Sequence, residues 1–416
     1  MFVRVPTPFV AIVAALVVIG SVSASHSAEP LTLAAAVDRT LRSNPDLAVL
    51  PARKLEQNAR IELAGLRPQL AIDAQIENAF GSGAYRDLNG TETSLSLSQV
   101  IELGDQRRKR LAAARDGMDT LELAQTVAQL DVVAETTRRY IELASEEQQR
   151  TLAAQWLAAS QRKTSEVERR VKAARDPEVE LVRAQIDLSR AELSVRVAAD
   201  RVRIAQRKLA AMWGATEPDF ERIDVDLFNL PNIEALQHRM EKIASSADFL
   251  LFATEIRQRE AEMALAKAQA RASITVSAGI RRLEATGDQA FIAGFSMPLA
   301  SARYAKPRIA EAQARRDGLE RERDAALIKA RASLFEVAAR LTHAVEEAQT
   351  LRDDLLPRME TAVKATEYAW QRGRYGYIEL TEAQREQLAL RLALITAATN
   401  AHLYRIEIER LTGDSP

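Results

Sequence analysis

Cysteine is absent from the 416-residue chain. Its absence excludes disulfide bonds, thiolate metal ligands, cysteine nucleophiles and a lipidated N-terminal cysteine. Aromatic residues make up only 5% of the chain, whereas apolar residues make up 47%. Alanine and leucine must therefore supply most of the packing, which favours thin helical bundles over a wide core filled with aromatic side chains.

Net charge is also nearly absent, because 57 lysines and arginines almost cancel 58 aspartates and glutamates. No basic field therefore argues for nucleic acid as a partner. The four histidines show no His-x-x-x-His spacing, so no bound metal is expected. No nucleophile elbow, phosphate loop or dinucleotide fingerprint occurs. We therefore expect neither an enzyme nor a cofactor.

The N-terminus has the pattern of an export signal. Arg4 supplies a positive charge, and an apolar run without charges extends from Phe9 to Ile19. Small residues then offer cleavage after Ala24 or Ala28, so residues 1–28 are predicted to be a signal peptide. A membrane anchor is the alternative, but the run is shorter than the roughly 20 residues that a helical span needs. An exported chain without such a helix can still enter a membrane as a β-barrel.

A repeat with a constant offset divides the rest of the chain. The segment Glu180–Gln185 (Glu-Leu-Val-Arg-Ala-Gln) returns as Glu379–Gln384 (Glu-Leu-Thr-Glu-Ala-Gln), 199 residues later, from position 180 to position 379. Gly214 and Gly413 close the two copies at the same offset. The repeat indicates one architecture built twice, with a first unit at 29–230 and a second at 231–416.

Each unit holds two short segments in which apolar and polar residues alternate, which predicts β-hairpins at about 68–102 and 272–299. The apolar residues stand at positions 70, 72, 74, 76, 95 and 97, and at 274, 276, 278, 280, 291, 293, 295 and 297. Alternation over about ten residues is the transmembrane barrel pattern, although a soluble hairpin packed on helices gives the same signal. Four strands cannot close a barrel, because the smallest barrels need about eight. Their edges must therefore pair with other subunits, and three protomers would supply twelve strands.

Long helical sequence follows each strand pair. From Asp105 to Ala173 no proline occurs, and apolar residues recur at spacings of three and four, which predicts a helix about 100 Å long. Asp176-Pro177 ends it, and a second helix is predicted from Glu178 to Met212. The helical hairpins are thus expected at about 105–213 and 306–411.

Prolines qualify this helical pattern. Pro307 is expected in a first helical turn, and Pro357 is expected to produce a kink or joint. Shorter helical regions are predicted at Leu33–Leu66 and Ile233–Ala270. Pro51 lies inside the first of these and has no explanation from the sequence.

Several segments carry a resemblance to a known family. Leu31–Val37 together with Asn44-Pro45 resembles the N-terminal helix pair of the TolC-type outer-membrane efflux channels. The strand segments look most like the CzcC-like heavy-metal (cobalt-zinc-cadmium) resistance branch of that family; they are Glu77–Gly83, Ser94–Gly104, Gly279–Glu284 and Phe295–Leu299. The resemblance extends from Leu31 to Gly413.

This resemblance implies a mostly α fold with a β-barrel contribution. Each protomer would supply long coiled-coil hairpins and four transmembrane strands to a homotrimer. The trimer would place a twelve-stranded barrel among outer-membrane lipid of a Gram-negative cell and a helical tunnel in the periplasm. The implied partners are a periplasmic adaptor (membrane fusion protein) and an inner-membrane RND transporter. The expected adaptor-docking tips are the helix-to-helix turns, with residues Arg175, Asp176, Pro177, Gly373, Arg374, Tyr375 and Gly376.

The resemblance also implies a pore constriction lined by acidic side chains, and Glu379 and Glu382 occupy the matching positions. Their i,i+3 spacing places them on one helix face, so a trimer would hold a ring of carboxylates that favours cations. The alternative is two ordinary solvated glutamates. Glu180 and Trp370 are expected at the partner positions of the gate helices, although Trp370 lacks the hydroxyl of an aromatic locking residue.

The function expected from these features is a passive, gated outer-membrane exit duct of a tripartite efflux system. Its expected cargo is divalent heavy-metal cations of the cobalt, zinc and cadmium class. A multidrug or organic-toxicant channel is the alternative. A periplasmic coiled-coil adaptor would explain export and helices but not four alternating strands.

Overall fold

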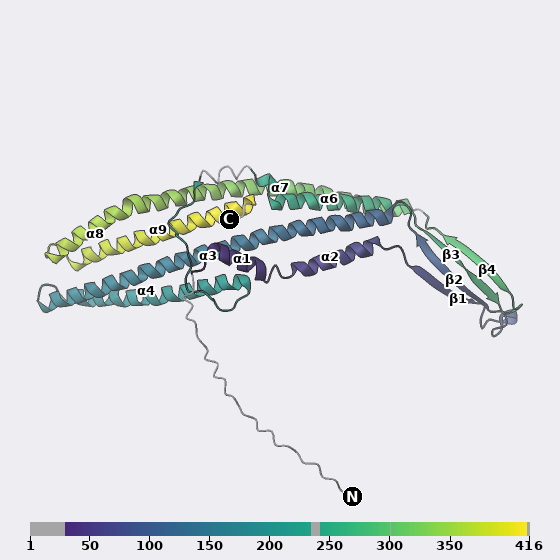
Figure 1. The fold of residues 1–416 in the computed structure, drawn as a ribbon, viewed down its shortest axis with the longest axis horizontal. Helices are drawn as coiled ribbons and strands as arrows, with labels where there is room; N and C mark the ends of the chain where they lie inside the picture. The colour runs from purple at the N-terminus through teal and green to yellow at the C-terminus, as the bar shows by residue number, and fades with distance from the viewer. Residues whose placement is uncertain (1–29, 234–241, 300, 414–416) are drawn as a thin grey trace, which may run out of the picture.

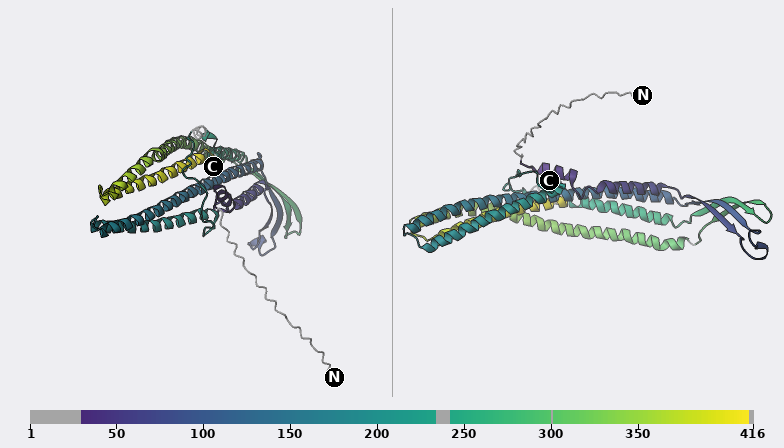
Figure 2. Two further views of the ribbon diagram at one scale, coloured as in Figure 1. Left: turned by 60° about the vertical axis from the view of Figure 1, so that its left-hand side comes forward. Right: turned by 90° about the horizontal axis from the view of Figure 1, so that it is seen from below.

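The computed structural model describes residues 30–233, 242–299 and 301–413. The predicted signal peptide, residues 1–28, lies outside the described residues. The protein is an elongated helical body with a small sheet at one end and two helix-to-helix tips at the other (Figures 1 and 2). The predicted fold class, long helical hairpins with four strands, is confirmed.

Strand and helix order follows the repeat. The first half contains α1 (Leu33–Ser43), α2 (Leu50–Gly65), β1 (Leu70–Glu77), β2 (Glu92–Ile101), α3 (Gln106–Lys172) and α4 (Glu178–Ala210). The second half contains α6 (Ala247–Ala268), β3 (Ile274–Leu283), β4 (Gln289–Ser296), α7 (Ser301–Thr350), η4 (Leu351–Leu355), α8 (Leu356–Gln371) and α9 (Tyr377–Thr412). Short 3₁₀ turns lie at η1 (Gly83–Tyr85), η2 (Ala211–Trp213) and η3 (Ile243–Ser245).

The first predicted helical region, Leu33–Leu66, consists of two helices. Asn44 ends α1, and its side-chain oxygen accepts hydrogen bonds from the backbone N–H groups of Asp46 and Leu47. Pro51 then occupies the first turn of α2, where the missing N–H has no helical partner to lose. This break explains the proline that the sequence left unexplained. In the second predicted region, α6 begins at Ala247, and residues 234–241 lie outside the described residues.

The prolines of the second helical hairpin behave differently from each other. Pro307 lies inside α7, which already begins at Ser301, so its expected place in the first turn is wrong. At Pro357 the expected joint is present. The π-helical turn η4 directly precedes α8, whose first turn holds Pro357. Proline has no backbone N–H to donate to the preceding turn. The altered hydrogen-bond pattern of a π turn accommodates this loss. In the first repeat α3 runs for 67 residues as one helix.

The 199-residue offset reappears in the backbone conformation. Gly214 and Gly413 end their copies with nearly equal left-handed φ angles, 76° and 78°. At the tips, Ala174 and Gly373 correspond, and both have positive φ (55° and 71°). Glycine adopts this conformation freely, whereas the Cβ of alanine strains it. The first tip therefore carries strain that the second avoids.

The four strands form one antiparallel sheet in the order β1-β2-β3-β4, with β1 and β4 at its edges. Register places the predicted apolar residues in shared rows, for example Ala74, Leu95, Ile280 and Phe291. That face is uncovered, with Ile72 73% and Phe291 74% exposed. The opposite face is polar and contains Arg281, which pairs with Glu77 and Glu92. The sheet thus presents an apolar surface that the single chain does not bury.

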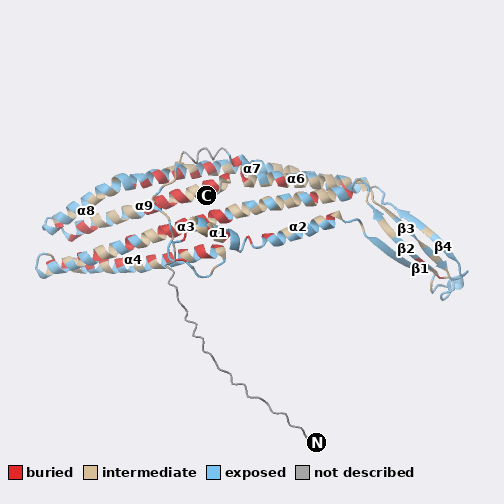
Figure 3. Ribbon diagram, viewed as in Figure 1, coloured by how far each residue is buried: buried red, intermediate tan, exposed pale blue. Residues whose placement is uncertain are grey.

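Burial gathers in the middle of the helical body (Figure 3). There Tyr140 is fully buried, and its hydroxyl lies 2.8 Å from the carbonyl oxygens of both Leu31 and Asp224. On α4 the buried alanines recur every seventh residue, and they are Ala184, Ala191, Ala198 and Ala205. A seven-residue period of small residues lets α4 lie close against α3 as a coiled coil.

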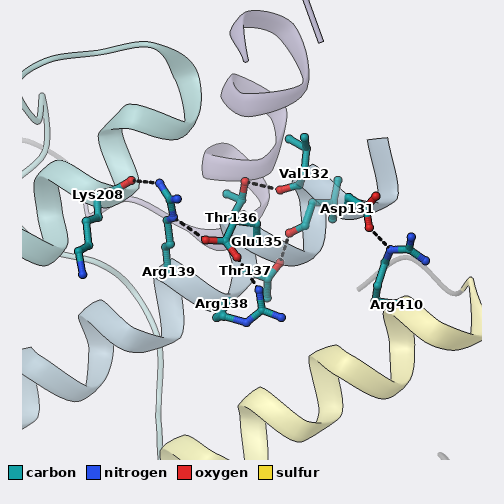
Figure 4. A network of polar contacts seen from close by, with 10 residues as sticks. Asp131, Val132, Glu135, Thr136, Thr137, Arg138, Arg139, Lys208 and Arg410 are labelled. Carbon is teal, nitrogen blue, oxygen red and sulfur yellow. Dashed lines mark hydrogen bonds and ion pairs between the residues drawn. The ribbon is translucent and has the colours of Figure 1, made fainter. Parts of the chain in front are cut away.

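Polar contacts fix the neighbouring helices in this middle region (Figure 4). Arg139 of α3 donates to Glu135 and to the backbone oxygen of Lys208 on α4. Arg410 of α9 pairs with Asp131 of α3 at 2.5 Å and with Asp248 of α6 at 2.6 Å. A single guanidinium thereby joins three helices from both repeats.

Replacing Ala174 by glycine should relieve the strain at the first tip. We expect local stabilisation of about 1 kcal/mol, hence roughly fivefold slower hydrogen exchange at the tip amides. Hydrogen exchange with mass spectrometry measures it. Ala173→Gly is the control, because Ala173 has a negative φ of −86° and gains no relief. Equal effects of the two glycines would contradict the strain.

Candidate gate at the helical tips

Arg170 contacts both tips: it forms a buried ion pair within the first and reaches the second through one backbone hydrogen bond and one aromatic ring. Arg170 near the end of α3 donates two hydrogen bonds to Asp176, at 2.7 and 2.8 Å, and a third to the backbone oxygen of Gln371 in the second repeat, at 3.2 Å. Its guanidinium also lies 4.7 Å from the ring centre of Trp370. Asp176 raises the pKa of Arg170. The bidentate geometry is the strong form of this contact and fixes Arg170 within the first tip, from which it reaches Gln371 and Trp370 of the second.

The predicted docking residues divide into two groups at these tips. Asp176 directs its carboxylate inward, and only 7% of its side chain is exposed. The remaining predicted docking residues are exposed: Arg175, Pro177, Gly373, Arg374, Tyr375 and Gly376. Docking at these exposed residues remains a prediction.

A second polar contact joins the helices just beyond the tips. The Tyr377 hydroxyl of α9 donates to Asp187 Oδ2 of α4 at 3.0 Å, and Arg385 donates to Asp187 Oδ1 at 2.6 Å. Tyr377 is 2% and Asp187 6% exposed, and burial raises the pKa of Tyr377 to about 12. Burial of the Asp187 carboxylate depends on these two donors, one neutral and one charged, because a buried acceptor without a partner is destabilising. We call this three-residue contact the tip seam.

Sequence reasoning missed the tip seam, although one signal was available. Asp187 is buried between Ala184 and Ala191 on the face of α4 that carries the alanine repeat. A carboxylate on a buried apolar face needs a partner. The aromatic residue singled out instead, Trp370, is 3% exposed, and its indole N–H has no hydrogen-bond partner among the described residues. Trp370 therefore packs against Arg170. The aromatic hydroxyl that bonds across the two repeats belongs to Tyr377 instead.

Lys163 of α3 lies directly beneath the tip seam. Its ammonium donates to Gln384 Oε1 at 3.1 Å and lies 5.1 Å from the ring centre of Tyr377 and 5.6 Å from that of Trp156. Burial lowers the pKa of Lys163 to about 8, against the opposing effect of Asp187. The aromatic faces hold the charged form by cation–π attraction.

Glu180 of α4 lies at the start of α9. Its carboxylate is close to the backbone N–H of Tyr377, where the helix has no side-chain cap of its own. Burial and then Asp176 raise the pKa of Glu180, whereas the N–H lowers it. A carboxylate at this position complements the positive end of the helix dipole. Glu180 therefore contacts the second repeat, and its role as a gate-helix partner remains a prediction.

The predicted constriction residues, Glu379 and Glu382, are both exposed on the first turns of α9. Glu382 lines a cavity of about 330 Å³ between α4 and α9, which the tip seam borders. The other lining residues are Arg183, Ile186, Asp187, Arg190, Tyr377, Ile378, Thr381 and Arg385. On the opposite side of the seam, a groove of about 700 Å³ lies between α3 and the helices α8 and α9.

Two further properties concern metals and membranes. Across residues 30–233, 242–299 and 301–413, no group of three or more histidines, aspartates or glutamates is placed to hold a metal ion. Over the same ranges, every helix is too short or too polar for a membrane span.

This architecture, with strands at one end and paired helical hairpins joined at the other, is that of the TolC-family channels. Residues 36–215 match the sequence model of the outer membrane efflux protein family. It is 25% identical to the cobalt-zinc-cadmium resistance protein CzcC of Cupriavidus metallidurans, over 93% of this chain and 91% of that protein.

Solved structures agree on the fold. The chain matches CusC with a TM-score of 0.76 at 16% identity, over 93% of each chain. It matches the outer membrane protein VceC of Vibrio cholerae with a TM-score of 0.74 at 17% identity, over 92% of this chain and 96% of that one.

The buried ammonium of Lys163 predicts a pH dependence of stability. The unfolded chain keeps this proton up to the ordinary lysine pKa of 10.5, whereas the folded chain releases it near 8. Between these values the unfolded state binds more protons, so stability should rise with pH. In Lys163→Met this rise should disappear, as measured by unfolding midpoints from pH 7 to 10.

The control is Lys172→Met, because the Lys172 side chain is 74% exposed and pairs only with Glu168 of the same helix among the described contacts. An identical pH profile in both variants would show that burial of Lys163 does not govern the effect.

Proposed function

We propose that the protein is the gated outer-membrane exit duct of a tripartite efflux system, and that it catalyses no reaction. The tip seam is the observation that carries this proposal. It joins two helical hairpins near their free ends through one buried carboxylate, and loss of that contact would make separation of the hairpins easier. Energy would come from an inner-membrane RND transporter, linked through a periplasmic adaptor.

Assembly as a homotrimer is supported by surfaces that one chain leaves uncovered. Exposed apolar residues follow α4 at spacings of three, four and seven, and they are Val179 (52%), Val182 (49%), Ile186 (48%), Leu193 (54%) and Val197 (42%). Such a stripe is the seam of a helical interface. The edge strands β1 and β4 likewise need partners. Three copies would close twelve strands, with the apolar face of the sheet against outer-membrane lipid.

In such a trimer the exposed Glu379 and Glu382 would surround the opening and concentrate cations there. The exposed tip residues Arg374 and Tyr375 would meet the adaptor. The groove between α3 and the helices α8 and α9 extends from these tips and offers a surface for an adaptor helix.

Divalent heavy-metal cations of the cobalt, zinc and cadmium class are the proposed cargo. The support is the 25% identity to a cobalt-zinc-cadmium resistance protein over nearly the full length. A passive duct needs no resident metal ligand set, because tight binding would slow release.

Asp187→Ala should open the duct. The substitution leaves the Tyr377 hydroxyl without its acceptor. The ion pair with Arg385 contributes little, because Arg385 is half-exposed. We therefore expect the closed state to lose about 1–3 kcal/mol of stability. The ratio of open to closed channels should rise about fivefold or more, as measured by conductance in planar bilayers.

Asp200→Ala is the matched control, since Asp200 lies on the same helix and pairs with Arg203 one turn away. Assembled Asp187→Ala trimers with unchanged conductance would show that the tip seam is not a gate.

Deletion of the gene should sensitise its host to zinc, cobalt or cadmium, and a plasmid with the wild-type gene should restore growth. Growth inhibition across divalent metals and amphiphilic drugs measures this. Sensitivity to drugs alone would move the cargo to organic toxicants, and unchanged growth in all conditions would oppose an efflux role under those conditions.

A further inference from the structure

The cavity beside the tip seam is lined by more positively charged than negatively charged side chains. Three arginines line it, Arg183 and Arg190 from α4 and Arg385 from α9. The two carboxylates of the same lining are Asp187 and Glu382. Asp187 is already engaged, because it accepts hydrogen bonds from Tyr377 and Arg385.

The arginines keep most of their donor groups unused. No ion pair within 4.0 Å involves Arg183 in the described part of the chain, and Arg190 reaches Asp187 only at 3.8 Å. Glu382 likewise forms no ion pair with any of these arginines, all of which are described. A guanidinium presents five N–H groups in a fork that suits oxyanions. Arg190 and Arg385 are 70% and 52% exposed in the single chain. Because Ile186 of the same lining belongs to the apolar stripe of α4, the cavity lies beside a subunit interface in the proposed trimer.

We propose that this cavity binds a small multivalent oxyanion and that the bound anion holds the tip seam closed. The anion would accept from Arg183 and Arg190 on one helix and from Arg385 on the other. A volume of about 330 Å³ is ample for phosphate or sulfate. The inference rests on the proposed function, because it makes the same seam responsive to a ligand.

The direction of the effect follows from linkage. The three guanidinium groups line one cavity only while α4 and α9 are held together. An anion that binds this arrangement better than the separated one stabilises the closed state by its difference in affinity. Arg385 can donate to the anion with its remaining N–H groups and still keep its bond to Asp187. The ligand therefore adds a second bridge across the seam.

The test uses the purified, full-length channel in planar bilayers, with phosphate replacing chloride at constant ionic strength and pH 7.5. Conductance of the wild type should fall as phosphate increases. In the double variant Arg183→Gln, Arg190→Gln the phosphate concentration for half effect should rise at least tenfold, because two charge-assisted contacts are lost. Calorimetric titration of phosphate into the detergent-solubilised protein should show the same loss of affinity.

The matched control is Arg196→Gln, Arg201→Gln. It removes the same charge from the same helix at exposed positions outside the cavity, and its phosphate response should equal that of the wild type. Equal loss in both double variants, or a wild type that does not distinguish phosphate from chloride, would overturn the anion site. Failure to form any pore would instead contradict the proposed function, so the two ideas fail separately.

Discussion

Close approach of α4 to α3 through small side chains is the constraint on which the rest of the structure depends. Alanine recurs every seventh residue on the buried face of α4, and this period keeps the two helices in contact along their length. A face built from alanine buries little area per residue, so polar contacts must fix the register. Arg139 of α3 does so through its hydrogen bond to the backbone oxygen of Lys208 on α4. Arg410 joins α3 to α9 and α6 in the middle of the body, and Asp187 joins α4 to α9 near the tips.

Much of this fold could be predicted from periodicity. Period-two and period-3.6 patterns located the strands and the long helices, and the repeat located both tips. The break before Pro51 was missed because it depends on the Asn44 side chain bonding to nearby backbone, which competes with a helix locally. Tyr377 was missed because its partner Asp187 is 190 residues away, and only tertiary packing brings them together. Burial of Asp187 on an alanine face was the available clue.

The region around the tip seam combines charges of opposite sign within a short distance. Acidic side chains are exposed on the first turns of α9, whereas arginines from both repeats line the adjacent cavity. In the proposed channel, a cation passage need not be uniformly negative. Attraction of cations would depend on the exposed carboxylates, whereas contact between the hairpins would depend on a buried carboxylate and its donors. Permeation and closure would then rest on separate residues.

The two hairpins differ in one further respect. The outgoing helix of the first repeat, α3, is continuous for 67 residues, whereas its counterpart is divided by the π turn η4 and Pro357 into α7 and α8. A continuous helix resists bending, whereas a π turn followed by proline is a site where helices kink. A force applied at the tips would therefore bend the second hairpin at η4, whereas α3 would keep the first hairpin straight. The two copies of the repeat therefore differ in stiffness: the first hairpin is rigid, and the second has a joint.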